Sequence, residues 1–356
     1  MVDRVQFDVN SSNSLCVGTG LIALDVLING KNEGTLRLWA GGSCGNVLTI
    51  LAYMGWLSYP IANLGEDRAS DIILSDIKRW GVKTDFIYRS QKTITPIIIE
   101  KLNNNGRTAT HEFKFKCPIC GSPLPRNKPV PSRLLQEIIE KIPVARVYYF
   151  DRISRAAIKL AKEQRLRGAL IVFEPCKFSR EKLFKECLKI SHIVKYSREQ
   201  IDIHALESNI PLEIQTLGSE GLRYRFRKSE EACQEWKKMQ AFHVSDLIDS
   251  AGAGDWCTAG IIHLLGQKGA ESFFERSEEE VEEALKFGQV LAALKCSYEG
   301  ARGLMHSLSR NELESLACKV IEGKSVDLHV STVIQESERR PLQYICPSCG
   351  SKERNG

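Results

Sequence analysis

Long apolar runs are missing from this sequence. Nowhere do about eighteen apolar residues stand together, which is the length that a membrane-spanning helix requires. The N-terminal segment MVDRVQFDVNSSNS carries Asp3 and Asp8 and contains no apolar stretch of signal-peptide length. The sequence therefore argues against a membrane partner and a secretory leader, and we expect a cytoplasmic protein.

A strong excess of charge of one sign is missing as well. The 49 basic and 44 acidic side chains leave a formal net charge of +5 on 356 residues, which is too small to indicate a nucleic-acid partner by itself. Such a partner is disfavoured but stays open. The hydrophobic fraction of 43% excludes a disordered or fibrous chain, and the length predicts one large domain or two average ones.

Three common ligand-binding motifs are also absent. The GKS at 323–325 lacks the upstream glycine of a P-loop, because Cys318 stands there. Residues 18–23 match the loose dinucleotide fingerprint, but the residues that follow continue as a strand instead of opening a helix. The seven histidines form no His-Glu-x-x-His pair. Any nucleotide or metal must therefore be bound by other means.

The middle of the chain alternates short β-rich runs with longer helical patterns. Strands are predicted at 146–150, 169–174 and 192–196, with helices at 154–165 and 181–189 between them. This alternation predicts an α/β fold, in which helices cover both faces of a parallel sheet. Ligands in such folds bind at the carboxyl ends of the strands.

The flanking regions follow a different pattern. Strands at 15–29 and 95–102 are expected to form a separate small sheet, with the Gly-rich segment 41–45 between them. Prolines from 118 to 131 mark an insertion, because they break regular elements. The other predicted elements are helices at about 46–54, 256–265 and 309–322 and a strand-like run at 241–248.

The most informative segment is DSAGAGD at 249–255. Its glycines let the backbone turn tightly, so that successive N–H groups at a helix N-terminus can converge on one anion. Gly252, Ala253 and Gly254 would form this anion hole. Asp255 would then accept the proton of an attacking hydroxyl group. The alternative interpretation of the segment is a helix cap with glycine turns.

Five motifs in chain order resemble those of the ribokinase-like, or PfkB-type, carbohydrate kinase family. They are GTGLIALDVLING at 18–30, AGGSCGN at 40–46, NLGEDRASD at 63–71, TLGSEG at 216–221 and DSAGAGD at 249–255. The resemblance runs from about residue 15 to residue 303. It implies a three-layer α/β sandwich with a mostly parallel central sheet and a small β lid over the acceptor.

The resemblance implies transfer of the γ-phosphate of ATP to a hydroxyl group of a sugar or nucleoside-like molecule, with Asp255 as general base and Mg²⁺ bridging the phosphates. It places Asp25, Gly41, Gly42 and Asn46 at the acceptor, and Thr216, Gly218, Gly221, Ser197, Glu199 and Gln289 at the nucleotide and its metal. It also suggests a monovalent-cation site near LAALKCSYEGARG at 291–303, and it leaves open a homodimer formed through the lid.

Three positions depart from the family pattern. Glu-Pro-Cys at 174–176 replaces Asp-Pro-Asn, and Gln289 stands where Asn is frequent. At 197–200 the usual Asn-x-x-Glu is missing, so that its acidic residue is either shifted to Glu199 or replaced by Gln200. A second hypothesis therefore stays open: a zinc-containing binding or regulatory protein on a catalytically retired kinase scaffold. The retained Asp of the last motif argues for the enzyme.

The sequence repeats one cysteine motif, as CPICGS at 117–122 and CPSCGS at 346–351. Two such knuckles supply four thiolates, which is the ligand set of a tetrahedral structural Zn²⁺ site. The expected ligands are Cys117, Cys120, Cys346 and Cys349. Two independent redox pairs, or metal sites shared between subunits, are the alternatives. The expected role is structural, with recognition of a nucleic acid or protein as the sharper alternative.

These observations predict three parts of the chain. The kinase domain is expected at 1–335, with lid strands at approximately 15–40 and 90–115. The insertion with the first knuckle spans 111–131, and a C-terminal tail with the second knuckle spans 336–356. The zinc site, a zinc-ribbon-like appendage, requires the tail to return beside the insertion.

Overall fold

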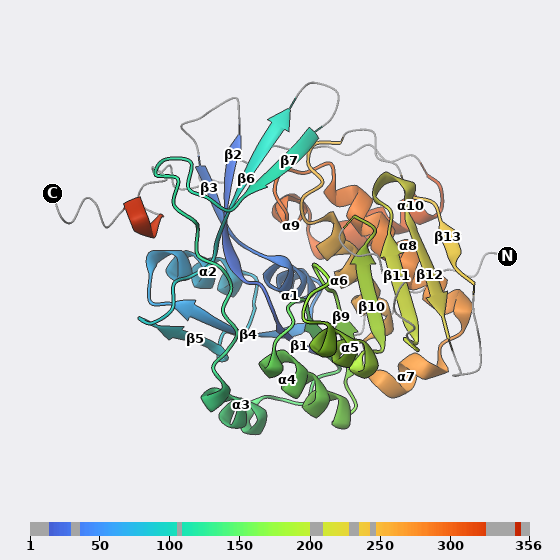
Figure 1. Ribbon diagram of the computed structural model, residues 1–356. Coiled ribbons are helices and arrows are strands. Elements are labelled where there is room, and N and C mark those ends of the chain that lie inside the picture. The colour runs from blue at the N-terminus through green and yellow to red at the C-terminus, as the bar shows by residue number, and fades with distance from the viewer. Residues whose placement is uncertain are drawn as a thin grey trace.

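A computed structural model describes most of the chain. The described residues are 14–29, 36–104, 109–199, 209–227, 235–242, 247–324 and 346–349. Within them the strands form a nine-stranded sheet and a four-stranded sheet (Figure 1). Most of the predicted C-terminal tail and Gln200 lie outside the described residues.

The nine-stranded sheet forms the centre of the molecule. Its order is β13 (Lys237–Met239), β12 (Leu222–Phe226), β11 (Leu212–Thr216), β10 (Ile193–Ser197), β9 (Leu170–Phe173), β8 (Val147–Phe150), β1 (Leu15–Thr19), β4 (Leu57–Gly65) and β5 (Ile87–Ser90). Neighbours from β11 to β5 are parallel, and β12 and β13 are antiparallel. The central strands β8 and β9 are apolar throughout, because helices cover both of their faces.

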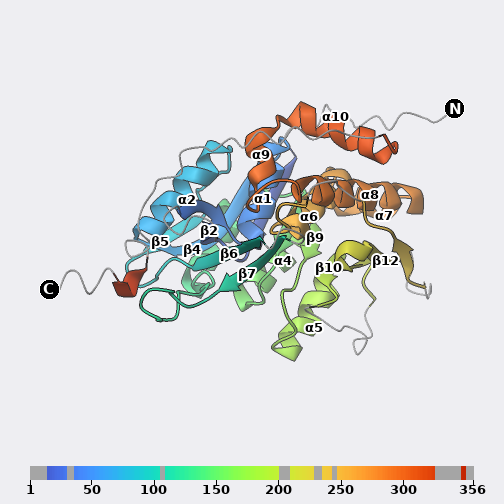
Figure 2. The same cartoon turned by 90° about the horizontal axis from the view of Figure 1, so that it is seen from above.

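Two helical layers enclose this sheet. One layer contains α1 (Ser43–Tyr53), α6 (Ala253–Leu265), α7 (Ala270–Glu275), α8 (Glu278–Lys295), α9 (Gly303–Ser307) and α10 (Arg310–Ile321). The other contains α3 (Leu135–Lys141), α4 (Arg155–Leu166) and α5 (Glu181–Ile190), on the opposite side of the sheet in Figure 2. Gly260 of α6 and Gly288 of α8 let these two helices approach closely: a Cβ atom on Gly260 would lie 2.9 Å from Cα of Gly288.

The small sheet stands beside the carboxyl end of β4. Its order is β3 (Leu36–Gly41), β2 (Ala23–Asn29), β6 (Ile97–Asn104) and β7 (Ala109–Lys114), with β2 and β6 parallel and the other pairs antiparallel. One face packs on α2 (Arg68–Arg79) in a separate core that also includes the knuckle cysteines. Because side chains alternate along a strand, Asp25 and Glu100 lie on the other face.

The predicted elements between 146 and 196 are confirmed to within about two residues. The expected lid range of 15–40 is wrong at its beginning, because β1 pairs with β4 and β8 of the large sheet. The chain changes sheet after Gly20, where a Cβ atom would lie 1.6 Å from Oδ1 of Asp151. β7 runs into the start of the predicted insertion at 111–131. No strand is found at 241–242 or 247–248 within the strand-like run.

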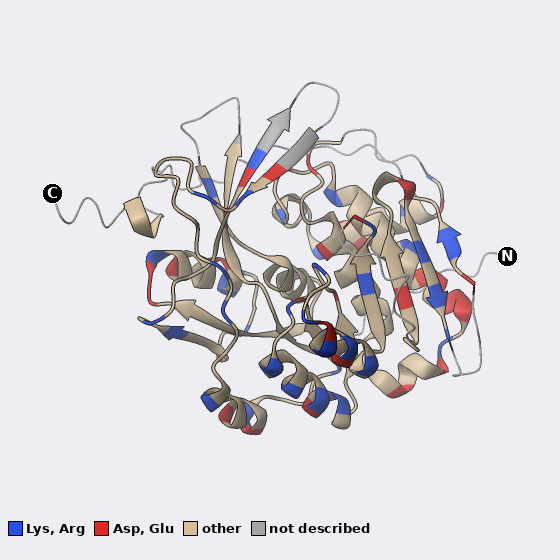
Figure 3. Ribbon diagram, in the orientation of Figure 1, with Lys and Arg blue, Asp and Glu red and all other residues tan. Residues whose placement is uncertain are grey.

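The surface charge of the described residues is mixed. Lysines and arginines lie beside acidic residues on α3, α4 and α5 (Figure 3). Ion pairs such as Lys162 with Glu186, at 2.5 Å, are typical of a solvated helix face. No helix among the residues that the structure describes is long and apolar enough to span a bilayer.

Candidate active site and cysteine cluster

The segment DSAGAGD forms a turn followed by the first residues of α6. Gly252 precedes the helix with a φ of 76°, and a Cβ atom there would lie 2.7 Å from Ala301. Glycine is therefore required both by the left-handed backbone and by the close approach. Ala253 begins the helix and donates its N–H to the carbonyl oxygen of Ser250 at 3.2 Å, and Gly254 is exposed. The first N–H groups of a helix have no partner within the helix. This is the local geometry of an anion-binding helix N-terminus.

Asp255 is half-buried in the first turn of α6. Nδ2 of Asn46 donates a hydrogen bond of 2.8 Å to its Oδ2 atom. Burial raises the pKa of Asp255 to about 8, and the negative charge of Glu174 adds to this rise. Asn46 comes from α1, 209 residues earlier in the sequence, and its Oδ1 atom is buried with no hydrogen-bond partner in the described part of the chain. In the structure, a residue predicted to bind the acceptor, Asn46, therefore contacts the predicted general base, Asp255.

Asp25 and the glycine pair before α1 form a second contact. The backbone N–H of Gly42 donates to the Asp25 carboxylate. A Cβ atom on Gly41 would lie 1.7 Å from Oδ2 of Asp25, so only glycine leaves room for that carboxylate. Oδ1 of Asp25 is buried and has no partner among the described residues. Burial raises the pKa of Asp25 to about 7, and Arg302 opposes this shift.

Two further buried acidic residues lie in this region, and the sequence analysis missed both. Asp151 directly follows β8, and its Oδ1 atom accepts the N–H of Leu21 at 2.9 Å. Glu100 on β6 is 3% exposed, and its Oε1 atom is buried without a partner among the described residues. Burial raises the pKa of Glu100 to about 8, and Asp249 and Asp25 raise it further. The position of Asp151 after a strand was the available signal.

Glu174, which departs from the family pattern, belongs to a buried network. Its Oε1 atom accepts from Nζ of Lys195 at 2.5 Å, and its Oε2 atom accepts from Thr258 at 2.7 Å and Tyr149 at 3.1 Å. Nζ of Lys195 also donates to the carbonyl oxygen of Gly254 at 3.2 Å. The network therefore places a buried ammonium group directly behind the glycine turn. Lys195 and Thr258 were not predicted, because each stands alone in sequence.

The residues predicted to contact the nucleotide lie at the ends of β10 and β11, in the β11–β12 hairpin and on α8. Thr216 ends β11, and Gly218 begins the short helix η2 (Gly218–Glu220) of the β11–β12 hairpin. Gly221 has a φ of 97°, and a Cβ atom there would lie 2.1 Å from the carbonyl oxygen of Met239. Gln289 lines a cavity of about 510 Å³ beside this hairpin. The complete lining is Tyr224, Lys237, Lys238, Met239, Gln240, Phe242, Glu282, Lys286 and Gln289.

The volume of this cavity lies in the range of small-molecule sites. Its lining combines aromatic rings with three lysines, of which Lys237 pairs with Glu278 and Lys238 pairs with Glu220. Ser197 ends β10 and is half-buried, and Glu199 is exposed just beyond it. Glu174 and Glu199 are two carboxylates that could hold Mg²⁺. Glu174 is already bonded to Lys195, which leaves Glu199 as the candidate.

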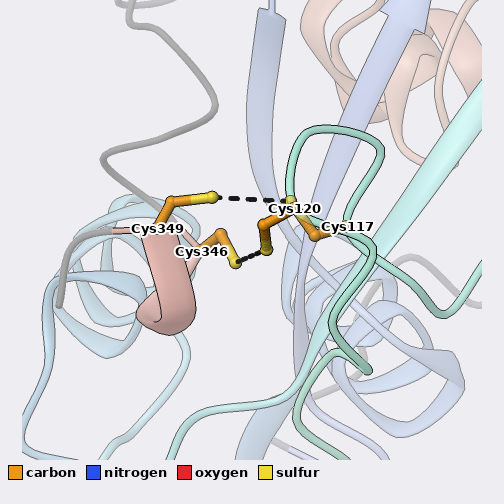
Figure 4. A group of neighbouring side chains, drawn as sticks. All are labelled: Cys117, Cys120, Cys346 and Cys349. Carbon is orange, nitrogen blue, oxygen red and sulfur yellow. Dashed lines mark hydrogen bonds between the residues drawn. The ribbon is translucent and has the colours of Figure 1, made fainter. Parts of the chain in front are cut away.

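The four knuckle cysteines converge, although Cys120 and Cys346 are 226 residues apart in sequence (Figure 4). All four Sγ atoms lie within 4.8 Å of one another. Sγ of Cys117 lies 3.8 Å from that of Cys349, and Sγ of Cys120 lies 3.7 Å from that of Cys346. A tetrahedral zinc site with Zn–S bonds of about 2.3 Å has S–S edges of about 3.8 Å. These distances fit a metal and are far longer than a disulfide bond.

Comparison with known proteins decides the family. Residues 13–113 and 184–308 match the model of the pfkB family carbohydrate kinases, and together they make up more than half of the chain. The chain belongs to this family. The PfkB-type resemblance and the phosphotransferase with an alcohol acceptor, both predicted from sequence, are therefore confirmed.

Individual relatives agree with this assignment. The kinase is 26% identical over 293 residues to probable fructokinase-6, chloroplastic, of Arabidopsis thaliana, covering 73% of this chain and 70% of that protein. A fructokinase with bound ATP from Xylella fastidiosa superposes with a TM-score of 0.67 at 17% identity, covering 87% of this chain and 99% of that one. A Burkholderia thailandensis nucleoside kinase in complex with inosine superposes with a TM-score of 0.63 at 14% sequence identity, covering 87% of this chain and 100% of that one.

The structural neighbours confirm the ribokinase-like α/β fold of the kinase, with its large mostly parallel sheet and its small sheet. ATP and Mg²⁺ are expected for the family. The Arabidopsis relative is named as chloroplastic, so the cytoplasmic location of this kinase stays a prediction.

Proposed function

We propose that this kinase transfers the γ-phosphate of ATP to a hydroxyl group of an uncharged sugar or nucleoside-like acceptor, with Asp255 as the general base. The hydrogen bond between Asn46 and Asp255 carries this proposal, because it joins the acceptor-side loop to the N-terminus of α6. A base with a pKa near 8 is suited to proton abstraction close to neutral pH.

In the proposed reaction the acceptor hydroxyl donates its hydrogen bond to Asp255. Its oxygen attacks the γ-phosphorus as its proton passes to the Asp255 carboxylate, and the bond between the γ-phosphorus and its bridging oxygen breaks to release ADP. The N–H groups of the 252–254 turn hold the phosphoryl oxygens, and Lys195, which is paired with Glu174, supports the turn through its hydrogen bond to the carbonyl oxygen of Gly254. Mg²⁺, bound with the nucleotide and near Glu199, would neutralise phosphate charge.

The acidic character of the acceptor side supports an acceptor without a phosphate or carboxylate. Glu100 and Asp151 are buried there, and Asp25 is half-buried with its Oδ1 atom buried. One oxygen atom each of Asp25 and Glu100 has no hydrogen-bond partner among the residues that the structure describes, and it is therefore available to accept a hydrogen bond from a hydroxyl group or an amine of the acceptor. Moving the charged phosphate group of a phosphorylated sugar from water into this low-dielectric region would be unfavourable.

A turnover screen tests the proposed function. The full-length kinase is incubated with Mg-ATP and a panel of pentoses, hexoses, inositols, amino sugars and nucleosides, each beside its phosphorylated counterpart. We expect turnover with at least one unphosphorylated compound and none with its phosphate ester. Turnover confined to phosphate esters contradicts the acceptor class. Ligand-induced stabilisation without any turnover would instead support the retired scaffold.

We also propose that the four-cysteine cluster holds one structural Zn²⁺ ion. Its cysteines belong to the same core as Ile22 and Leu24 near the lid, so the metal would join the second knuckle to the base of the small sheet. Metal binding that orders such a segment also stabilises the fold. The homodimer through the lid and the monovalent cation remain predictions.

Metal analysis tests the zinc proposal. We expect about one zinc per wild-type chain, as for a single four-thiolate site. The double variant Cys346→Ser, Cys349→Ser should lose the metal and melt at a lower temperature. Cys318→Ser is the matched control, because this half-buried cysteine lies on α10, outside the cluster. A full zinc content in the double variant would rule out the shared site.

A further inference from the structure

A second buried ammonium group lies near the turn that precedes α6. Lys295 is the last residue of α8, and its side chain is 0% exposed. Its Nζ atom donates to the backbone carbonyl oxygen of Asp249 at 2.6 Å and lies 3.6 Å from Oδ2 of the same residue. Burying a cation is costly unless the protein compensates it, so a lysine at this position requires an explanation beyond packing.

Asp249 connects this ammonium to the glycine turn. Its Oδ1 atom accepts the N–H of Ala251 at 2.8 Å, and its Oδ2 atom accepts the N–H of Gly300 at 2.7 Å. The carbonyl oxygen of Cys296 accepts the N–H groups of both Ile248 and Asp249. One aspartate thus organises the segment entering the turn and the loop after α8, and the Lys295 ammonium bonds to its backbone.

The two loops touch again beyond Asp249. Gly252 packs against Ala301 so closely that a Cβ atom would clash, and Nε1 of Trp256 donates to the carbonyl oxygen of Ala301 at 3.0 Å. The position of the turn therefore depends on the loop after α8. A cation that holds Asp249 in place holds the N–H groups of the turn in place as well.

We propose that Lys295 serves as a built-in monovalent cation, a positioning residue that fixes the 252–254 turn so that the kinase needs no free potassium ion. A free cation at this place would coordinate a carbonyl oxygen and a carboxylate, and both are already contacted by the ammonium. The inference rests on the proposed phosphoryl transfer, because it assigns the anion-binding turn as the element that the cation positions.

Two substitutions test the charge and the volume of the Lys295 side chain separately. Lys295→Met keeps an unbranched chain of similar length but removes the charge, so Asp249 loses its cationic partner. Lys295→Ala leaves a polar cavity beside the Asp249 carbonyl and carboxylate, which K⁺ or NH₄⁺ can enter. The surface variant Lys141→Ala is the control, because this exposed lysine on α3 forms its ion pair with Glu137 of its own helix.

The experiment measures kcat, KM for ATP and thermal stability of the purified full-length kinase in sodium, potassium and ammonium salts of equal ionic strength. We expect wild type and Lys141→Ala to respond equally to all three salts. In sodium, both Lys295 variants should lose about tenfold or more in kcat, the effect of misplacing transition-state hydrogen-bond donors. Potassium or ammonium should restore turnover and raise the melting temperature of Lys295→Ala only.

Several results would overturn the inference. A wild-type enzyme that requires potassium has no built-in cation. A Lys295→Met variant with wild-type kcat in sodium shows that the charge positions nothing, even if Lys295→Ala does not fold. If wild type turns over no acceptor, the proposed function fails separately. The melting temperatures still test the cation site, because only Lys295→Ala should be stabilised by potassium over sodium, and equal responses of all variants reject it.

Discussion

The proposed acceptor side and the proposed nucleotide side of the active site differ in charge. On the acceptor side the buried ionisable groups are mostly acidic, and burial raises the pKa of Asp25, Glu100 and Asp255. The nucleotide cavity is lined by three lysines and by Glu282, which accepts a hydrogen bond from Tyr224. This difference separates the two substrates: hydroxyl donors suit one side and phosphates suit the other.

Removing the base should have the largest effect. Asp255→Asn keeps the shape of the side chain and its contact with Asn46, but it cannot take the proton of the acceptor. We expect kcat to fall by about 10²–10⁴, the usual contribution of a general base. Binding of ATP and acceptor, measured by calorimetry, should change little. A variant that keeps more than about a tenth of wild-type kcat would contradict the assigned role.

Glu100→Gln tests the acceptor side. The amide keeps the size of the side chain but removes the ionisable carboxyl group beside Asp25. We expect KM for the acceptor to rise by about tenfold above pH 8, where the Glu100 carboxylate is charged, since a hydrogen bond to a charged group contributes about 1.5–3 kcal/mol. KM for ATP should stay the same. Equal changes in both constants would show that Glu100 acts on the fold as a whole rather than on the acceptor.

Lys286→Glu tests the nucleotide side. The reversed charge in the cavity wall should raise KM for ATP by several-fold, as expected for roughly 1 kcal/mol at a partly solvated site. The acceptor KM should not respond. Because this effect is electrostatic, it should shrink as the salt concentration increases. An unchanged KM for ATP at low salt would remove this cavity from the proposed nucleotide site.

The smallest expected effect is on the pH dependence of stability. The folded state binds the Asp255 proton more tightly than the unfolded chain, so it holds more protons between the ordinary pKa of 3.8 and about 8. Stability that depends on this proton is lost as pH rises through that window. The Asp255→Asn variant does not lose this stability, because asparagine does not titrate. Its melting temperature relative to wild type should increase from pH 5 to pH 8 by at least about 2 °C, and a difference independent of pH would contradict the raised pKa.

Local patterns predicted the parts of the site that depend on backbone geometry. The turn before α6 and the Gly41–Gly42 pair were found in sequence, because glycines are needed wherever a backbone bends sharply or approaches a carboxylate. Lys195, Glu100 and Lys295 were not assigned any role. The local sequence around each of them carries no motif, and only the burial of the side chain in the folded protein draws attention to it.

The strand at 15–29 shows the same limit within the fold. Its apolar pattern is continuous, so periodicity alone predicts one strand or two strands of one sheet. In the structure the chain crosses at Gly20 from the large sheet into the small one, where Asp151 occupies the space that a side chain would need. The reason for the break lies 131 residues away and has no local signal.

The sequence by itself determined the alternation of strands and helices, the family motifs and the two cysteine knuckles, since each depends on residues close together along the chain. Tertiary structure alone decided that Asn46 meets Asp255, that Lys195 and Lys295 lie near one turn, and that four cysteines share one volume. The physical reason is that burial and charge pairing act through space, between segments whose separation in sequence carries no information about their contact.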